Sequence, residues 1–469
     1  MKRKRRIYEW HWAYSFFKPY VIFMYRLSYG RREYHGLEKI PVNQPIIYAP
    51  NHTSALMDAM SVLDIDTSAK VFVARADMFK NPLFAKILFF LRIMPIHRIR
   101  DGRSSLKNNE EIIQESVEVL RNNVPFVIAP EGTHRPMHNL LPLGKGIFRI
   151  ALLANEELNK PQQGSITTQH SPGAPEDLGQ SVTTFAQPGS GSVHHVYIIP
   201  VGLEYGHFFR YRTSLLCQIG DPINVTQHVI DNPDKEHPVL MNELKELLQD
   251  SLKKLILYIP DDDDYTATWE LCGLSAHHRI KQMGLQKRSL KDRLQANRQT
   301  VQLVLEKKET APEESKRMLE EIARFAQKRR QKRISMTSVA NPAPLVALLT
   351  RIPLLILLFP YFVACTVPAL PTLFLTWFIC SKMEDRAFHN SVRYIITMVL
   401  WTLTVIIAIP LLFILLPWPL SLLLLLLGLP APFFFYQYNK WFRIARSNIS
   451  WLLSRDLRQD KKRFVNWIA

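Results

Sequence analysis

The sequence has few cysteines and, over two long intervals, no charged residues. Its four cysteines are far apart, form no C-x-x-C pair and have no histidine at ligand spacing. This argues against a disulfide scaffold and a cysteine zinc site, and we expect no bound metal. Asp, Glu, Lys and Arg are absent from residues 352–381 and 394–439. A helix needs about 20 apolar residues to cross a bilayer, so both intervals predict membrane insertion.

The flanks of these intervals suggest how often the chain crosses. The second interval is long enough for two crossings, with a turn at Pro417–Pro419, whereas the first is interrupted by Pro360, Pro368 and Pro371 and fits one span or a hairpin. Residues 316–333 and 440–463 each contain eight Lys or Arg. Basic flanks stay on the cytoplasmic side. We therefore expect two hairpins in a multi-pass protein, some of them re-entrant, rather than one span plus a hairpin.

The excess of basic residues fits a membrane surface. The chain has 59 Lys and Arg against 41 Asp and Glu, a net charge of +18. Anionic headgroups attract such residues, and no nucleic-acid-binding motif supports the rival partner. Residues 2–6 are basic and precede an aromatic-rich stretch without a small-residue cleavage site. This predicts an interfacial N-terminal helix, the alternative being an amphipathic helix packed on the protein's own domain.

Composition divides the chain into five parts. Short apolar runs alternate with helical patterns in the second part, which predicts an α/β layer fold, and 47% apolar residues suffice for a core. Residues 280–333 show helical character without a sustained apolar stripe, so we expect a connector near the membrane surface. The parts are an N-terminal helix (1–30), an α/β domain (31–260, with a disordered insertion at 161–192), a charged helical connector (261–340), transmembrane hairpins (341–440) and a basic tail (441–469).

The first candidate for chemistry is the pair His52 and Asp58, which lies between a predicted strand and a predicted helix. A carboxylate that accepts the Nδ1 proton of a histidine fixes its tautomer and leaves Nε2 free to take a hydroxyl proton. Such spacing also occurs by chance, and a strand-end histidine beside a helix-start aspartate is the alternative interpretation.

Two further segments carry candidates for binding an anion or a hydroxyl. Arg98 and Arg100 follow a short strand and suit a phosphate, although a surface ion pair with Asp101 is the alternative. The third segment lies at the end of a predicted strand, where α/β proteins place ligand sites, and an ordinary turn is the alternative. Its candidates are Glu131, Gly132, Thr133, Arg135 and, opening the next helix, Lys145.

Taken together and in order, these segments resemble the glycerolipid acyltransferases, which include glycerol-3-phosphate and 1-acylglycerol-3-phosphate acyltransferases. The resemblance covers about 200 residues and depends on the order of its blocks more than on any one of them. Two departures occur: five residues rather than four separate His52 from Asp58, and the arginine usual after Thr133 is displaced by His134 to Arg135. The four blocks are Asn51–Asp58, Met94–Arg98, Pro130–Thr133 with Gly144–Arg149, and Ile198–Val201.

The resemblance implies a function and a mechanism. The fold would be a layered α/β domain of the glycerolipid acyltransferase type, joined to an all-α C-terminal membrane region. His52, oriented by Asp58, would deprotonate a hydroxyl of glycerol 3-phosphate or its 1-acyl derivative, which attacks the thioester of acyl-CoA or acyl carrier protein. Arg98 would bind the phosphate, and Glu131, as an acceptor from ligand hydroxyls, would complete the glycerol-phosphate site with Gly132. Thr133 is a further substrate-binding candidate, and Arg100, Arg135 and Lys145 are weaker candidates for the same anion.

No cofactor is expected beyond this acyl donor, and no covalent acyl-enzyme. The partners would be the acyl donor, the glycerol phosphate acceptor and a phospholipid membrane, in phospholipid biosynthesis. We expect the catalytic domain on the cytoplasmic side, in a bacterial cytoplasmic membrane rather than the endoplasmic reticulum. The alternative is a membrane scaffold with an inert acyltransferase-like domain.

Overall fold

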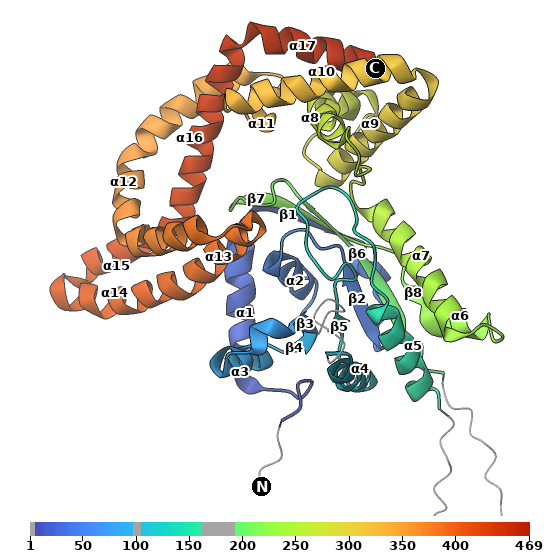
Figure 1. Cartoon of the computed structure of the whole chain (residues 1–469). Helices are drawn as coiled ribbons and strands as arrows, with labels where there is room; N and C mark the ends of the chain where they lie inside the picture. Colours follow the sequence, from blue (N-terminus) through green and yellow to red (C-terminus); the bar gives the residue numbers. More distant parts are fainter. Residues whose placement is uncertain (1–4, 97–104, 161–192) are drawn as a thin grey trace, which may run out of the picture.

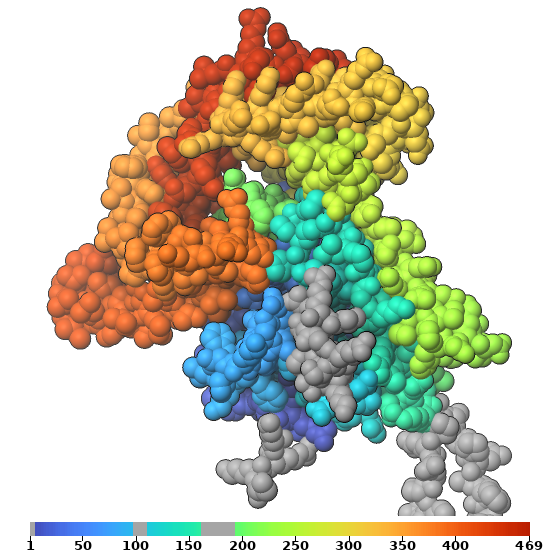
Figure 2. Space-filling model, in the orientation of Figure 1, coloured from blue at the N-terminus to red at the C-terminus, as the bar shows by residue number. Residues whose placement is uncertain are grey.

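The computed structural model describes residues 5–96, 105–160 and 193–469. Arg98, Arg100 and the insertion predicted at 161–192 lie outside the described residues, so their predicted roles stay predictions. Figure 1 shows three regions in this part of the chain: a sheet domain, a helical unit above it, and a group of apolar helices at one side. The space-filling view shows the apolar helices in contact with the sheet domain and standing out from it (Figure 2).

The sheet has eight strands in the order β1-β7-β6-β2-β5-β3-β4, with β8 paired to β6. Neighbours from β6 to β4 run parallel, as do β1 and β7, whereas β7 and β8 are antiparallel to β6. The strands are β1 (Tyr29–His35), β2 (Ile46–Pro50), β3 (Val71–Arg75), β4 (Ile93–Ile96), β5 (Phe126–Val127), β6 (Tyr197–Tyr205), β7 (Thr213–Ile219) and β8 (Ile223–Asn224).

Helices cover both faces of this sheet, because alternate strand residues point to opposite sides. In β2, Ile47 and Ala49 pack into the core beneath α4 (Ser105–Arg121), α5 (Gly146–Leu158) and α7 (His237–Leu255). Ile46 and Tyr48 pack into the core on the other face, under α1 (Trp12–Leu27) and α2 (Leu56–Leu63). The predicted α/β layer fold is confirmed. The smaller helices are α3 (Pro82–Phe90), α6 (Val225–Ile230) and the 3-10 turns Leu37–Lys39 and Ala76–Phe79.

The N-terminal helix α1 has two different faces. Met24 and Tyr25 are buried in the core of the domain, whereas Trp12, Phe16 and Phe23 are exposed. The helix therefore packs on the protein's own domain and still presents an aromatic face to its surroundings, which combines features of both interpretations of this segment.

The charged segment after the sheet domain folds into a helical unit with its own core. It comprises α8 (Tyr265–Gln282), α9 (Leu290–Thr310), α10 (Pro312–Gln331), α11 (Met336–Val339) and α17 (Arg455–Trp467). The expectation that residues 280–333 lack an apolar stripe is wrong: Leu319, Ile322 and Phe325 of α10 are buried. Phe464 of α17 stacks edge-on against Phe325 at 5.6 Å. Helix α17, which lies in the predicted basic tail, is therefore packed into the core of the helical unit.

The apolar intervals form long helices. They are α12 (Pro344–Lys382), the stretch Arg386–Leu415 that contains α13 (His389–Ile396) and α14 (Thr402–Leu415), α15 (Trp418–Gly428) and α16 (Ala431–Leu453). The first two are long and apolar enough to cross a membrane, and α15 with α16 meets this test jointly, bent by 45°. The chain turns between α14 and α15, as predicted.

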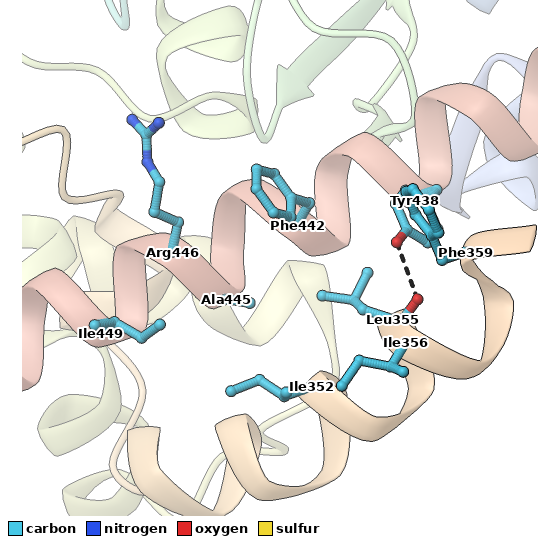
Figure 3. Close-up of a pocket in the computed structure, with 9 residues that line it drawn as sticks. All are labelled: Ile352, Leu355, Ile356, Phe359, Tyr438, Phe442, Ala445, Arg446 and Ile449. Carbon is cyan, nitrogen blue, oxygen red and sulfur yellow. Dashed lines mark hydrogen bonds between the residues drawn. The ribbon is translucent and has the colours of Figure 1, made fainter. Parts of the chain in front are cut away.

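The first apolar interval forms one helix, so the hairpin expected there is wrong. Helix α12 runs for 39 residues through four internal prolines. Prolines are tolerated in apolar helices where neighbouring groups satisfy the freed backbone. Helix α16 packs along α12, and Tyr438 donates a hydrogen bond to the Leu355 carbonyl at 2.9 Å. A groove of about 470 Å³ lies between these two helices, with Phe442 and Arg446 on its α16 side (Figure 3).

Both ends of α12 are attached to the same body. Just before it, Val339 of α11 is buried in the core of the helical unit. Just after it, Asp385 bonds His134 of the sheet domain at 2.8 Å. The helical unit in turn contacts the sheet domain, where the Tyr265 hydroxyl accepts from the His138 amide at 2.8 Å. The apolar helices therefore leave this body and return to it.

Candidate active site

The predicted pair His52 and Asp58 meets in the loop between β2 and α2. His52 Nδ1 lies 2.8 Å from Asp58 Oδ2, and Asp58 is 1% exposed. Ala55, just before α2, has φ of +50°, a conformation that side chains other than glycine rarely adopt. This bend turns the chain so that the first turn of α2 faces the loop. It leaves Nε2 of His52 as the ring nitrogen that does not face Asp58.

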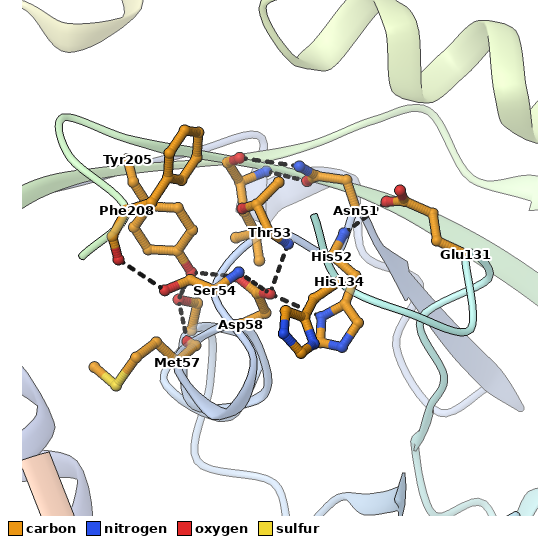
Figure 4. A network of polar contacts seen from close by, with 12 residues as sticks. Asn51, His52, Thr53, Ser54, Met57, Asp58, Glu131, His134, Tyr205 and Phe208 are labelled. Carbon is orange, nitrogen blue, oxygen red and sulfur yellow. Dashed lines mark hydrogen bonds and ion pairs between the residues drawn. The ribbon is translucent and has the colours of Figure 1, made fainter. Parts of the chain in front are cut away.

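Asp58 receives four hydrogen bonds, which fix its position (Figure 4). Besides His52, the amides of Thr53 and Ser54 donate to Oδ2 at 2.9 and 2.7 Å. The Tyr205 hydroxyl donates to Oδ1 at 2.6 Å, and burial raises the pKa of Tyr205, which keeps that proton in place. The carboxylate is therefore held as an acceptor for His52. The sequence analysis did not identify Tyr205, because nothing in its pattern marks the end of β6.

Glu131 braces the same loop from the end of β5. Its Oε1 accepts from the His52 amide at 2.7 Å and its Oε2 from the Leu141 amide at 2.9 Å. Burial raises the pKa of Glu131 to about 7, although these two hydrogen bonds oppose the shift. The structure thus gives this carboxyl two backbone partners in the protein. The contact to a ligand hydroxyl that we expected stays a prediction.

The remaining described candidates of this segment lie at different places. Gly132 has φ of +64°, a backbone conformation that favours glycine, and there is open space where a side chain would be. The turn conformation rather than a lack of space therefore explains the glycine. Arg135 forms an ion pair with Asp261 at 2.6 Å, and its amide donates to the His52 carbonyl. Lys145 is exposed at the start of α5. Thr133 is half-buried. None of these positions tests the predicted phosphate contacts.

A second histidine, His134, stands beside His52 and was not among the predicted site residues. Its ring meets the His52 ring edge-on, with 5.5 Å between centroids. Its Nε2 lies 2.8 Å from Asp385 Oδ2, and Phe388 contacts its ring at 4.9 Å. Asp385 and Phe388 belong to the connection between α12 and α13. The apolar region therefore contributes two residues to the surroundings of the site, which local sequence patterns cannot reveal.

The site has no evident place for a metal ion. In the ranges that the structure describes, no three His, Cys, Asp or Glu side chains are grouped as metal ligands would be. The donors around His52 are instead amides, a phenol and carboxylates. Their arrangement suits proton transfer at Nε2, because the carboxylate orients the ring and can stabilise the imidazolium. The absence of a cofactor stays a prediction.

The chain resembles known acyltransferases in sequence. Residues 31–203 match the family model described as Acyltransferase. A chloroplastic 1-acyl-sn-glycerol-3-phosphate acyltransferase of Brassica napus is 28% identical over 122 residues, 26% of this chain and 33% of that protein. The enzyme of the same name from Cocos nucifera is 30% identical over 110 residues, 24% of this chain and 34% of that protein. The chain thus spans about a third of the length of the curated relatives it matches.

A solved structure is also similar. The 1-acyl-sn-glycerophosphate acyltransferase of Thermotoga maritima aligns at 18% identity with a TM-score of 0.33, over 52% of this chain and 81% of that one. The part of the chain that matches the acyltransferase model contains most strands of the mainly parallel sheet, with a histidine and a carboxylate at the carboxyl end of β2. Residues 31–203 are thus similar to acyltransferases, including the two named 1-acyl-sn-glycerol-3-phosphate acyltransferases.

Proposed function

We propose that this protein is a membrane-bound enzyme that transfers a fatty acyl group from a thioester donor to a hydroxyl of glycerol 3-phosphate or 1-acylglycerol 3-phosphate. The observation that carries the proposal is the hydrogen bond between His52 Nδ1 and the buried, fully bonded Asp58. The names of the relatives, 1-acyl-sn-glycerol-3-phosphate acyltransferases, support the choice of acceptor class.

In the proposed reaction, His52 Nε2 takes the proton of the acceptor hydroxyl as its oxygen attacks the thioester carbonyl. The C–O bond forms, the C–S bond breaks, and the thiolate leaves with the proton that His52 returns. Asp58 stabilises the imidazolium that exists between these two proton transfers. A positioned general base contributes roughly 100- to 10,000-fold, and positioning of both substrates supplies much of the rest. CoA and acyl carrier protein are both acidic and suit the basic chain as donors.

The test compares the full-length wild type with His52→Ala, using a labelled long-chain acyl-CoA and acyl carrier protein. Glycerol 3-phosphate, its 1-acyl derivative and dihydroxyacetone phosphate serve as acceptors, with products identified by mass spectrometry. His278→Ala, at an exposed histidine of α8, is the control. We expect transfer by the wild type and the control only. Equal transfer by His52→Ala would reject the base, and no transfer by any protein would favour a membrane scaffold.

We also propose that the apolar helices insert into a bilayer from one side, with the sheet domain on the cytoplasmic face and a bacterial cytoplasmic membrane as host. Both ends of α12 contact one body, which supports a re-entrant segment inserted from that side rather than a crossing, because a single crossing helix would place its ends on opposite sides. A 39-residue helix is about 58 Å long, well beyond the roughly 30 Å of a hydrocarbon core. Full-length protein should stay with membranes in a carbonate wash, and its release would overturn the insertion.

A further inference from the structure

Four arginines converge where the sheet domain meets the apolar helices. We name Arg210, Arg386, Arg393 and Arg443 the arginine cluster. Arg210 lies in the loop after β6, Arg386 and Arg393 flank the start of α13, and Arg443 is on α16. These elements are far apart in sequence, so the fold rather than a local run of basic residues brings the four charges together.

Two hydrogen bonds fix the elements that carry the cluster against one another. Arg393 Nη1 donates to the Phe209 carbonyl at 2.6 Å, which joins α13 to the loop after β6. Lys440 Nζ donates to the Arg212 carbonyl at 2.8 Å, which joins α16 to the other end of that loop. Arg210 lies between these two attachment points. The cluster is thus held by the backbone of the protein and not by acidic side chains.

The cluster has no balancing negative charge among the residues that the structure describes. None of its four members forms an ion pair with a carboxylate there, although 41 acidic residues are present in the chain. The nearest acids along the chain are Glu384, which makes no ion pair with Arg386, and Asp385, which bonds His134. Arg210, Arg386 and Arg443 are exposed. Like charges held close together favour an anion between them.

The pKa of His207 agrees with the closeness of the four arginines that the hydrogen bonds indicate. Burial lowers the pKa of His207 to about 3, and Arg210, Arg443, Arg386 and Arg393 lower it further in that order. Its Nδ1 accepts a hydrogen bond from the Phe209 amide at 3.1 Å, as a neutral ring does. The histidine thus adds no charge of its own to the cluster, and all four guanidinium groups lie near enough to act on it electrostatically.

The cluster borders the candidate active site. Tyr205, the donor to Asp58, precedes Arg210 by five residues, and the Phe208 carbonyl accepts from Ser54 Oγ at 3.4 Å. On the other side, Arg386 directly follows Asp385, the partner of His134. A ligand bound by the arginines would therefore lie next to the loops that form the site.

We propose that the arginine cluster binds a phosphate group at the junction between the catalytic domain and the membrane. Guanidinium groups bind phosphate through paired donors, and several together suit its multiple oxygens. Two sources present this chemistry: the phosphate of the acceptor, which rests on the proposed function, and the headgroup of a membrane phospholipid. Phe442 and Arg446, the neighbours of Arg443 along α16, line the apolar groove, where an acyl chain of either lipid can lie (Figure 3).

The experiment measures binding to the full-length chain in detergent by native mass spectrometry. The probes are dioleoyl phosphatidate, dioleoyl phosphatidylglycerol, dioleoylglycerol and glycerol 3-phosphate. The double variant Arg210→Gln/Arg443→Gln removes two charges of the cluster at exposed positions outside the catalytic pair. Arg330→Gln on α10, also exposed, is the matched control. Dioleoylglycerol has the same acyl chains without phosphate.

We expect the wild type and the control to bind both phospholipids more tightly than dioleoylglycerol. The double variant should bind the two phospholipids about 10- to 100-fold more weakly than the wild type does. Competition by glycerol 3-phosphate would identify the acceptor as the source, with a raised KM for the acceptor and unchanged kcat in the variant. Lack of competition would identify the headgroup. Equal binding of both phospholipids by the double variant and the wild type would overturn the proposal. This experiment measures binding and needs no acyl transfer. The proposal can therefore be tested even if the protein proves to have no acyltransferase activity.

Discussion

Replacement of Asp58 by asparagine separates the charge of this carboxyl from its shape. Four donors surround the group: His52 Nδ1 and two amides at Oδ2, and the Tyr205 hydroxyl at Oδ1. An asparagine oxygen in place of Oδ2 can still accept from the first three. Its NH2 group then faces Tyr205, whose hydroxyl can accept instead of donate. We therefore expect Asp58→Asn to fold with the His52 ring still in place.

The magnitude of the effect on rate follows from the lost charge. Hydrogen bonds to charged groups contribute about 1.5–3 kcal/mol and neutral ones about 0.5–1.5 kcal/mol. The imidazolium forms only during the reaction, so the loss of about 1–2 kcal/mol falls on the transition state, which corresponds to at least roughly 5- to 30-fold in kcat. The full contribution of the base, about 100- to 10,000-fold, is the upper limit, which His52→Ala measures.

Asp64 provides a matched control, because it is also a buried aspartate with a tyrosine donor. It accepts from the Tyr34 hydroxyl at 2.6 Å and pairs with Arg26 and Arg32, away from the histidine. Asp64→Asn should lower the thermal midpoint and leave kcat per folded molecule unchanged. The assay measures initial rates of acyl transfer beside thermal unfolding of each variant. Wild-type kcat in Asp58→Asn, at an equal folded fraction, would refute the role of the carboxylate.

Three further predictions concern the surroundings of the pair. Tyr205→Phe leaves Oδ1 of Asp58 without its donor, so unfolding should cost about 1–3 kcal/mol less, measured by denaturant titration. Glu131 has a pKa of about 7 in the folded protein against 4.5 when exposed. The stability that it contributes is therefore complete below about pH 4.5 and is lost as the pH rises toward 7. In the wild type the thermal midpoint should fall over this pH range, and in Glu131→Gln this contribution to the fall should be absent. Asp385→Asn frees His134 and should lower kcat at most about fivefold, since the pair is partly exposed; a loss as large as that of His52→Ala would contradict this.

The sequence predicts those parts of the site whose residues lie close together in the chain or at the ends of neighbouring strands. His52 and Asp58 are six positions apart around one strand-to-helix turn, so their meeting needs no distant contact. Glu131 joins them because β5 lies beside β2 with parallel register, and parallel neighbours bring their carboxyl ends to one edge. Alternating short apolar runs and helical patterns likewise indicate the α/β layers without any knowledge of strand order.

The parts that the sequence does not predict depend on contacts between distant segments. Tyr205 reaches Asp58 from 147 positions away, and Asp385 reaches His134 from 251 positions away. The apolar stripe of α10 is hidden by its many charges and packs against α8, α9 and α17, the last of which is more than 120 residues away along the chain. Prolines in the first apolar interval suggest a turn, yet α12 continues through them because α16 packs along its length.

The attachment of α13 to the sheet domain makes the apolar helices and the sheet domain depend on each other. Tyr394 of α13 is buried among the residues under α1, edge-on to Tyr25 at 6.3 Å, and its hydroxyl donates to the Val21 carbonyl at 2.9 Å. The region of apolar helices therefore completes the interior of the sheet domain. A truncated chain ending near residue 260 would uncover apolar surface and lose the partner of His134, so solubilised fragments are poor substitutes for the intact molecule.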